Sequence, residues 1–232
     1  MNTTTTTHAT EYSRDFITVK NQIYILYSQA LVTFFFPVIA AFCLTWVLWD
    51  VALRRILFVW LTLVIAHAVT RYFLLWKFHH DKITPDNTGV WLNRFLSSVL
   101  ISGILWGVAG IILVPYDNTI EYTLYNGLTL LITCGLVSGA LISYSINIWV
   151  LIAYSFPALI PPAVHLISLG DQYNSAFGGF ILLYYFFISV AAARMNRQFN
   201  RYVEMEHQQK ELIYKYERLK LVYSDFRKHL KK

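Results

Sequence analysis

The sequence predicts an all-α integral membrane protein: a bundle of six transmembrane helices followed by a long C-terminal cytoplasmic signalling helix. Three observations lead to this prediction. The 232 residues are 56% hydrophobic and only 14% charged, whereas an ordinary soluble domain carries about 25% charged residues. The apolar residues are gathered in long runs, which is typical of a chain whose solvent is lipid. The C-terminal segment, in contrast, is polar and basic.

The net charge of +6 belongs entirely to this C-terminal segment. From Arg194 to Lys232 the chain has 11 Lys/Arg and 5 Asp/Glu, and the other 193 residues have 8 of each sign. This distribution indicates a cytoplasmic flank of a membrane protein. It argues against a soluble enzyme and against a nucleic-acid-binding domain.

Six windows have the length of a spanning helix, which needs about 20 mostly apolar residues. They are 30–49, 56–76, 95–114, 122–142, 146–169 and 176–193. The segments between them are polar and rich in turn-forming residues; 77–94, for example, contains Pro85, Asn87 and Gly89 and predicts a loop. Links this short predict that consecutive helices are antiparallel neighbours.

These windows divide the chain into three parts, which are 1–29, 30–194 and 195–232. In the first part, a threonine-rich start is not followed by the basic and apolar regions of a cleavable signal peptide. Residues 15–29 then interleave apolar and polar side chains, which predicts an amphipathic entry helix on the inner leaflet. The alternative is an extension of the first span into the cytoplasm.

The C-terminal part has the pattern of a helix that pairs with a second copy. Its apolar residues alternate by four and three, and no Pro or Gly interrupts it. We expect a dimer seam formed by Leu212, Tyr216, Leu219, Tyr223, Phe226 and Leu230. The alternative is a surface helix whose basic residues bind anionic lipid.

Few ionisable residues fall inside the predicted spans, where charge is costly. His67 and Arg71 are four residues apart and share one helix face, and His165 lies in the fifth span. Arg71 is either an interfacial anchor or a cation that faces the bundle, and His67 is either a hydrogen-bonding residue or a ligand. With Trp106, these three residues are the candidates for ligand binding or signalling.

Glycines and prolines mark positions of close packing or bending. In the third span Gly103, Gly107 and Gly110 recur at three- and four-residue spacing, as Gly135 and Gly139 do in the fourth. Such spacing lets helix backbones approach closely in lipid. The fifth span contains three candidate hinge residues, Pro157, Pro161 and Pro162.

Several of these features together resemble a known module. The stretches SGILWGVAG at 102–110, YSQA at 27–30, GLVSGAL at 135–141 and FPALIP at 156–161, with Arg71 and the basic helix after Arg194, are similar to a six-transmembrane N-terminal sensor module. That module occurs in bacterial GGDEF diguanylate cyclases and hybrid sensor histidine kinases. The resemblance covers about 20–210 and implies a bacterial cytoplasmic membrane protein with both termini cytoplasmic, an orientation that the Lys/Arg distribution also predicts. It also implies a signalling helix that leads to an output domain, yet this sequence contains no GGDEF motif and no phosphoacceptor histidine block.

The sequence therefore predicts a non-enzymatic membrane module that senses a membrane or small-ligand stimulus. It would relay the stimulus through its C-terminal helix to a cytoplasmic domain or protein, as a homodimer in the lipid bilayer. No nucleotide-binding, zinc-protease or hydrolase motif occurs, so no catalytic residue, metal or cofactor is expected. The alternatives are a small transporter or channel, and a scaffold whose basic tail binds lipid or a partner.

Overall fold

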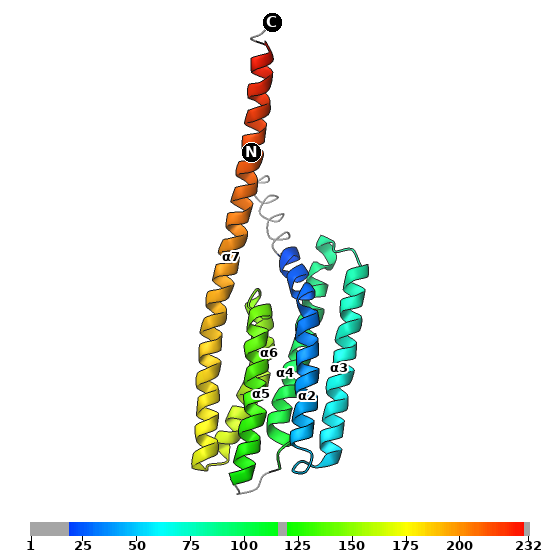
Figure 1. The fold of residues 1–232 in the computed structure, drawn as a ribbon, viewed down its shortest axis with the longest axis vertical. Coiled ribbons are helices and arrows are strands. Elements are labelled where there is room, and N and C mark those ends of the chain that lie inside the picture. Colours follow the sequence, from blue (N-terminus) through cyan, green and yellow to red (C-terminus); the bar gives the residue numbers. More distant parts are fainter. Residues whose placement is uncertain (1–18, 116–119, 230–232) are drawn as a thin grey trace, which may run out of the picture.

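The computed structural model describes residues 19–115 and 120–229, and every regular element in these ranges is an α-helix (Figure 1). A short helix at 19–28 precedes the labelled helices. These are α2 (Ala30–Val47), α3 (Arg54–His80), α4 (Pro85–Ile112), α5 (Ile120–Tyr144), α6 (Ile148–Ser168) and α7 (Gln172–His229).

The prediction of an all-helical fold is confirmed for the described residues. Five helices, α3 to α7, are long and apolar enough to cross a membrane. The apolar stretch described in α2, Phe34–Val47, is shorter than a membrane-spanning helix needs to be. Each of the six predicted windows nevertheless coincides with one helix, because long apolar runs bounded by turn residues fix where helices form.

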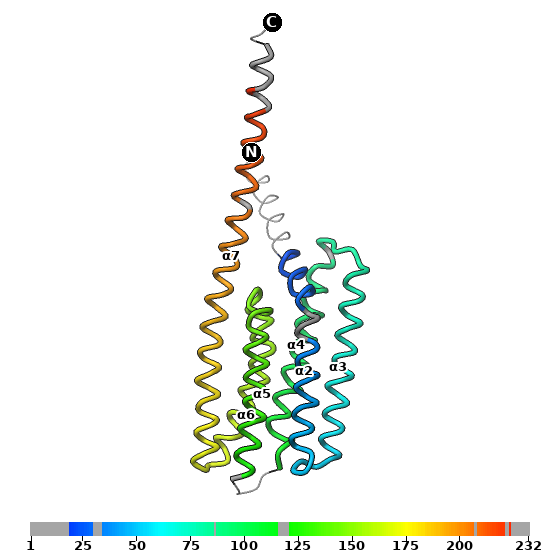
Figure 2. The backbone as a smooth tube through the Cα atoms, viewed as in Figure 1, coloured from blue at the N-terminus to red at the C-terminus, as the bar shows by residue number. Residues whose placement is uncertain are grey.

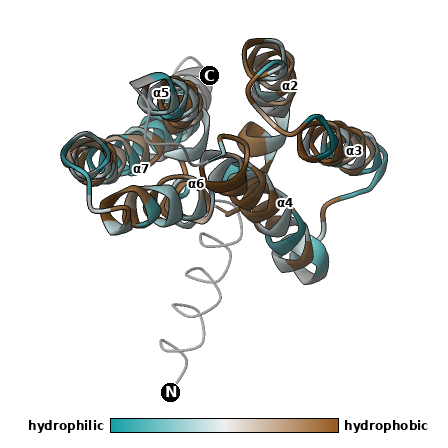
Figure 3. Cartoon of the chain, turned by 90° about the horizontal axis from the view of Figure 1, so that it is seen from below, coloured by the Kyte–Doolittle hydropathy of each residue, from teal (hydrophilic) through white to brown (hydrophobic). Residues whose placement is uncertain are grey.

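Consecutive helices pack against each other, as their short links predict. Seen along the helix axes, α4 and α6 lie at the centre, α2 and α3 lie on one side, and α5 and α7 lie on the other (Figure 3). The helix α2 also contacts α5. Neighbouring helices therefore form a ring in the order α2, α3, α4, α6, α7, α5.

The predicted loop at 77–94 is wrong, because most of it is helical. The helix α3 continues to His80 and α4 begins at Pro85, which leaves a link of only four residues, 81–84. Pro85 occupies the first turn of α4, where its missing N–H costs nothing. The backbone N–H of Thr84 donates to Asn87 Oδ1 at 2.9 Å, which is one half of a capping box. The turn-forming residues here start a helix.

The entry helix packs into the bundle instead of lying on the membrane surface. Only Gln29 separates the described helix at 19–28 from α2. Tyr27 is buried, stacks on Phe78 of α3 with ring centroids 3.8 Å apart, and donates to the Trp91 carbonyl of α4 at 3.2 Å. The structure therefore favours the alternative, an extension of the first span. Residues 15–18 of the predicted helix lie outside the described residues.

The last helix, α7, is one helix of 58 residues that runs along the bundle and then beyond it (Figure 2). At 1.5 Å per residue its length is about 87 Å. Its first part buries Ile181, Ile188 and Ala192 against the bundle, whereas side chains such as Leu212 and Leu219 are exposed. Two ion pairs at four-residue spacing, Glu206–Lys210 and Glu211–Lys215, lie on its outer part.

Candidate functional site

The centre of the bundle is a close contact between the glycines of α4 and the prolines of α6. A methyl group added to Gly103 would lie 2.8 Å from Pro157 Cγ, and one added to Gly107 would collide with the Pro157 carbonyl. At Gly110 it would lie 3.1 Å from the ring of Pro162. Packing through these three glycines is therefore confirmed. The helix α6 is continuous across Pro157, Pro161 and Pro162, and their role as hinges stays a prediction.

The glycines of α5 behave differently. A methyl group at Gly135 or Gly139 would meet no described atom within 4 Å, so the prediction of helix packing at these positions is wrong for the described residues. Both residues instead line a cavity. A four-residue glycine spacing leaves one helix face without side chains. Whether another helix packs on that face depends on the neighbouring helices.

Arg71 extends from α3 into the bundle and is buried there. The residue is only 5% exposed although it lies nine residues before the end of α3, about 13 Å along the axis at 1.5 Å per residue. Its Nη2 donates to the hydroxyl of Tyr144, the last residue of α5, at 3.0 Å. The guanidinium carbon lies 4.5 Å from the centre of the Phe34 ring of α2. Arg71 is thus the cation that faces the bundle, the second of the two readings left open by the sequence.

No carboxylate of the described residues lies within salt-bridge distance of Arg71. The ion pairs within the described ranges both lie on α7. The reason is in the sequence: no Asp or Glu occurs in 51–80, 87–116 or 122–170. Burial of an unpaired charge costs on the order of several kcal/mol. The Tyr144 hydroxyl and the electron-rich faces of Phe34 and Phe95 offset part of this cost.

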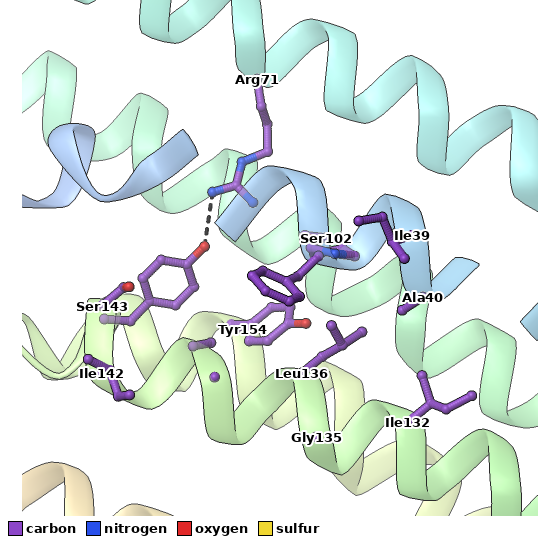
Figure 4. A pocket seen from close by; sticks show the side chains of 15 residues that line it. Ile39, Ala40, Arg71, Ser102, Ile132, Gly135, Leu136, Ile142, Ser143 and Tyr154 are labelled. Atoms are coloured by element: carbon purple, nitrogen blue, oxygen red, sulfur yellow. Dashed lines mark hydrogen bonds between the residues drawn. The ribbon is translucent and has the colours of Figure 1, made fainter. Parts of the chain in front are cut away.

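Arg71 lines a cavity of about 510 Å³ between α2 and α5, with α4 and α6 behind it (Figure 4). The buried side chains of Ser102 and Tyr154 form its inner wall. Its rim consists of exposed apolar residues, among them Phe36 and Ile142. The cavity is therefore lined mostly by apolar residues, and its polar groups are the guanidinium of Arg71 and the hydroxyls of Ser102, Ser143, Tyr144 and Tyr154. Its rim belongs to the exposed apolar surface of the bundle.

The α5–α6 link joins this cavity to α7. The link follows Tyr144 directly, and its Ser145 and Ile146 are both buried. The side-chain amide of Asn196 in α7 donates to both of their carbonyl oxygens, at 2.9 Å and 2.7 Å. The hydroxyl that holds Arg71 and the carbonyls that hold α7 therefore belong to three consecutive residues.

Of the other candidates, His67 and Trp106 lie beside Arg71, whereas His165 does not. His67 lies in the middle of α3 and lines a narrow pocket with Arg71 and Trp106, and the latter is buried and packs edge-on against Trp60. His165 lies in the last turn of α6, near the opposite end of the bundle (Figure 1). The described lining of the two cavities at His67 contains no residue of α6. Across the described ranges, no group of three or more His, Cys, Asp or Glu is placed to hold a metal ion.

The predicted dimer seam is exposed as far as the structure describes its side chains. Leu212, Tyr216, Leu219 and Tyr223 are between 65% and 70% exposed. The side chain of Phe226 and the whole of Leu230 lie outside the described part. The four described side chains of the seam are not buried within a single copy, and the pairing of the seam stays a prediction.

Sequence reasoning missed Tyr144, Phe34 and Asn196, which complete the arrangement around Arg71. The absence of any acidic residue in the spans could have pointed to a hydroxyl or aromatic partner for the arginine. It also missed Gly178 of α7, where an added methyl group would lie 2.7 Å from the Ala163 carbonyl of α6. Gly178 has no glycine three or four residues away, so the spacing pattern does not mark it.

Comparison with known proteins gives no relative: no family model, no curated protein sequence and no solved structure matches this chain.

Proposed function

We propose that this chain is the membrane-embedded sensory part of a signalling system. Occupancy of the cavity at Arg71 would be relayed to the outer part of α7, and from there to a cytoplasmic domain or protein. The observation that carries the proposal is the direct succession of Tyr144, Ser145 and Ile146. The first holds the cavity cation, and the next two hold Asn196 of α7.

This succession supports a relay because each step is a short hydrogen bond, buried at Arg71 and partly buried at Asn196. A ligand that draws Arg71 away from Tyr144 frees the end of α5, and the link residues move with it. Asn196 then follows or loses its two carbonyl acceptors. Because α7 is one uninterrupted helix, a tilt or rotation at Asn196 is transmitted to its outer end.

The distribution of charge supports a cytoplasmic position for the outer part of α7. The end of α3, which carries Lys77, and the α3–α4 link, which carries Lys82, lie at the end of the bundle from which α7 extends (Figure 1). Arg197 follows Asn196, which contacts the α5–α6 link, and Arg54 and Arg55 begin α3 at the other end. Under the positive-inside rule this distribution supports a cytoplasmic position for the tail, and a bundle of six spans would then have both termini on that side. The resemblance to bacterial sensor modules is consistent with this orientation and with a homodimer that pairs through the seam.

Spin-label distances within one copy test the relay. We would replace Cys43 and Cys134 by Ser, and attach labels at Lys82→Cys in the α3–α4 link and at Tyr214→Cys in α7. The distance between the two labels would be measured in lipid nanodiscs for three proteins: the labelled protein with no further change, the same protein with Asn196→Ala, and the same protein with Arg71→Met. Dilution with unlabelled protein restricts the measurement to distances within a copy. We expect both variants to shift or broaden the distribution.

The matched control is Gln198→Ala, two residues along the same helix and exposed. It should leave the distribution unchanged. If Arg71→Met leaves the distribution identical to wild type, the cavity is not coupled to α7 and the relay is wrong. Solute flux in proteoliposomes that depends on Arg71 would favour the transporter alternative.

A further inference from the structure

We infer that the cavity at Arg71 binds a single-chain amphiphilic anion, a long alkyl chain with one acidic head group such as a carboxylate. This inference names the stimulus of the proposed sensor, and its physiological role rests on that proposed function. The binding site itself is argued from the cavity alone.

The head-group site is the buried guanidinium. Arg71 is 5% exposed and has one hydrogen bond to a side chain, to Tyr144, so further N–H groups are available to a ligand. No described carboxylate neutralises it. Tyr144 accepts from Arg71 and keeps its own O–H, so a carboxylate between them could accept from both groups. Charge-assisted hydrogen bonds of this kind are the strong ones.

The alkyl chain has a matching groove. The cavity follows α5 from Tyr144 to Ile132, which is twelve residues or about 18 Å at 1.5 Å per residue. One leaflet of a bilayer has a hydrocarbon thickness of about 15 Å, half of roughly 30 Å. A chain whose head group is at Arg71 would therefore run parallel to the lipid chains towards the membrane centre. Leu136 and Ala40 line the groove on either side.

Two glycines create the room for this chain. Gly135 and Gly139 form part of the α5 wall, and an added methyl group at either would meet nothing within 4 Å. The volume of about 510 Å³ is in the range of sites that hold one small molecule. Exposed rim residues such as Phe36 and Ile39 are on the surface that faces lipid, so the ligand can enter sideways from the bilayer.

The charge of Arg71 distinguishes an acid from a neutral lipid of the same shape. An ester keeps the alkyl chain and a carbonyl acceptor but leaves the guanidinium without a counter-ion. We expect the protein to prefer the acid by about tenfold or more, because a hydrogen bond to a charged group is worth more than one to a neutral group.

Electron paramagnetic resonance with a matched pair of probes tests this preference. The probes are stearic acid with a nitroxide on its chain and the methyl ester of the same molecule. They would be added to the full chain in phosphatidylcholine nanodiscs at alkaline pH, where the acid is ionised. We expect a larger immobilised fraction for the acid than for the ester with wild type, and equal fractions with Arg71→Met. Equal fractions with wild type would overturn the inference.

A second variant pair guards against loss of fold in Arg71→Met. Gly135→Leu fills the groove and keeps Arg71, and Gly179→Leu introduces the same side chain on α7 at a position where a methyl group also meets no described atom within 4 Å. Gly135→Leu should abolish the preference for the acid, and Gly179→Leu should keep it. A preference that persists in Gly135→Leu would place the acid outside the cavity.

Competition identifies the source of the anion. Unlabelled stearate should displace the nitroxide acid, and phosphatidylglycerol at the same concentration should not. Displacement by phosphatidylglycerol alone would overturn the single-chain assignment. Stearate added to the protein labelled at Lys82→Cys and Tyr214→Cys separates the two proposals. If stearate binds but the distance does not change, the binding site is supported and the relay is wrong. If Arg71→Met changes the distance but stearate does not bind, the relay is supported and the binding site is wrong.

Discussion

Arg71 and Tyr144 are separated by 73 residues in the sequence, yet the Nη2 of Arg71 donates to the Tyr144 hydroxyl at 3.0 Å. The bond connects the middle of α3 with the end of α5. The ring of Phe34, from α2, covers the guanidinium at 4.5 Å. Three helices therefore meet at one buried charge, and the stability of the bundle depends on how this charge is held.

Loss of the Tyr144 hydroxyl should destabilise the protein more than loss of a tyrosine hydroxyl elsewhere. Tyr144→Phe leaves a buried guanidinium without its hydrogen-bond acceptor, and we expect the free energy of unfolding to fall by about 1–2 kcal/mol. Tyr72→Phe on the exposed face of α3 is the control and should have no measurable effect. Both would be measured by SDS titration of the detergent-solubilised protein.

Removal of the charge should then rescue Tyr144→Phe. A buried charge replaced by an apolar side chain of similar size is often neutral or stabilising. The double variant Arg71→Met/Tyr144→Phe should therefore be more stable than Tyr144→Phe alone. Additive destabilisation in the double variant would show that the two residues do not interact as the structure indicates.

The glycines of α4 and α5 should respond in opposite ways to alanine. Gly107→Ala places a methyl group against the Pro157 carbonyl, and we expect a loss of about 1–3 kcal/mol in the free energy of unfolding from overpacking. Gly135→Ala meets nothing within 4 Å and should change it by less than about 0.5 kcal/mol. The same SDS titration measures both. Similar losses at the two positions would mean that α5 is covered at Gly135.

The entry helix offers a test with two tyrosines one turn apart. Tyr27 is 2% exposed and Tyr24 is 47% exposed. Tyr27→Ala removes the stack on Phe78 and should cost about 3 kcal/mol, so trypsin should cleave after Lys20 much faster. Tyr24→Ala should change this rate far less. Equal cleavage rates in the two variants, measured by mass spectrometry, would favour a helix that lies on the membrane surface.

Composition and run length predict the helical membrane fold, because they depend on what a segment can bury in lipid. Helix ends are harder to predict, since Pro85 and Asn87 suit both a turn and a helix start. Only the bond between Thr84 and Asn87 decides between the two. Helix ends that carry polar and turn-forming residues are therefore read as loops.

The sequence identified the central residue of the candidate site but not the residues that surround it. A lone arginine in a span marks a special position, as Arg71 does. The direction of its side chain depends on which helix lies opposite, and the partners Phe34 and Tyr144 come from two other helices. In the same way, the spacing of Gly135 and Gly139 predicts a helix face without side chains. The positions of the neighbouring helices determine that no described atom packs on this face.

The start of α7 should be sensitive to acid. The backbone N–H and the side-chain amide of Asn174 both donate to the carboxylate of Asp171, at 2.8 Å and 2.6 Å, and these bonds lower the pKa of Asp171 below its ordinary value of 3.8. A lowered pKa means that this cap is fully formed above that value and is lost as the pH falls through the pKa of the folded protein.

Asn174→Ala removes the side-chain donor and should return the pKa of Asp171 towards 3.8. A titration of the Asp171 carboxyl carbon by nuclear magnetic resonance measures the shift. The control Gln172→Ala leaves both donors in place and should leave the pKa unchanged. An unchanged pKa in Asn174→Ala would show that the backbone N–H bond holds the carboxylate without the side-chain amide.

The exposed seam of α7 should pair two copies. Leu212 and Leu219 are 65% and 68% exposed, so pairing would bury apolar surface that a single copy leaves in water. We expect Leu212→Ala/Leu219→Ala to reduce energy transfer between copies labelled at Lys82→Cys in vesicles. Tyr214→Ala, on another face of the same helix and 65% exposed, should not reduce it.

The response to salt decides between this pairing and binding of the tail to anionic lipid. In a parallel pair with this seam, Lys215 of one copy lies near Lys220 of the other, and the segment from Arg194 carries a net charge of +6. Salt screens this repulsion, so energy transfer should rise between about 0.05 and 0.5 M ionic strength. Attraction of the same lysines to anionic lipid weakens under the same screening. A fall in transfer with salt, equal in Leu212→Ala/Leu219→Ala and wild type, would therefore mean that lipid gathers the copies and the seam does not.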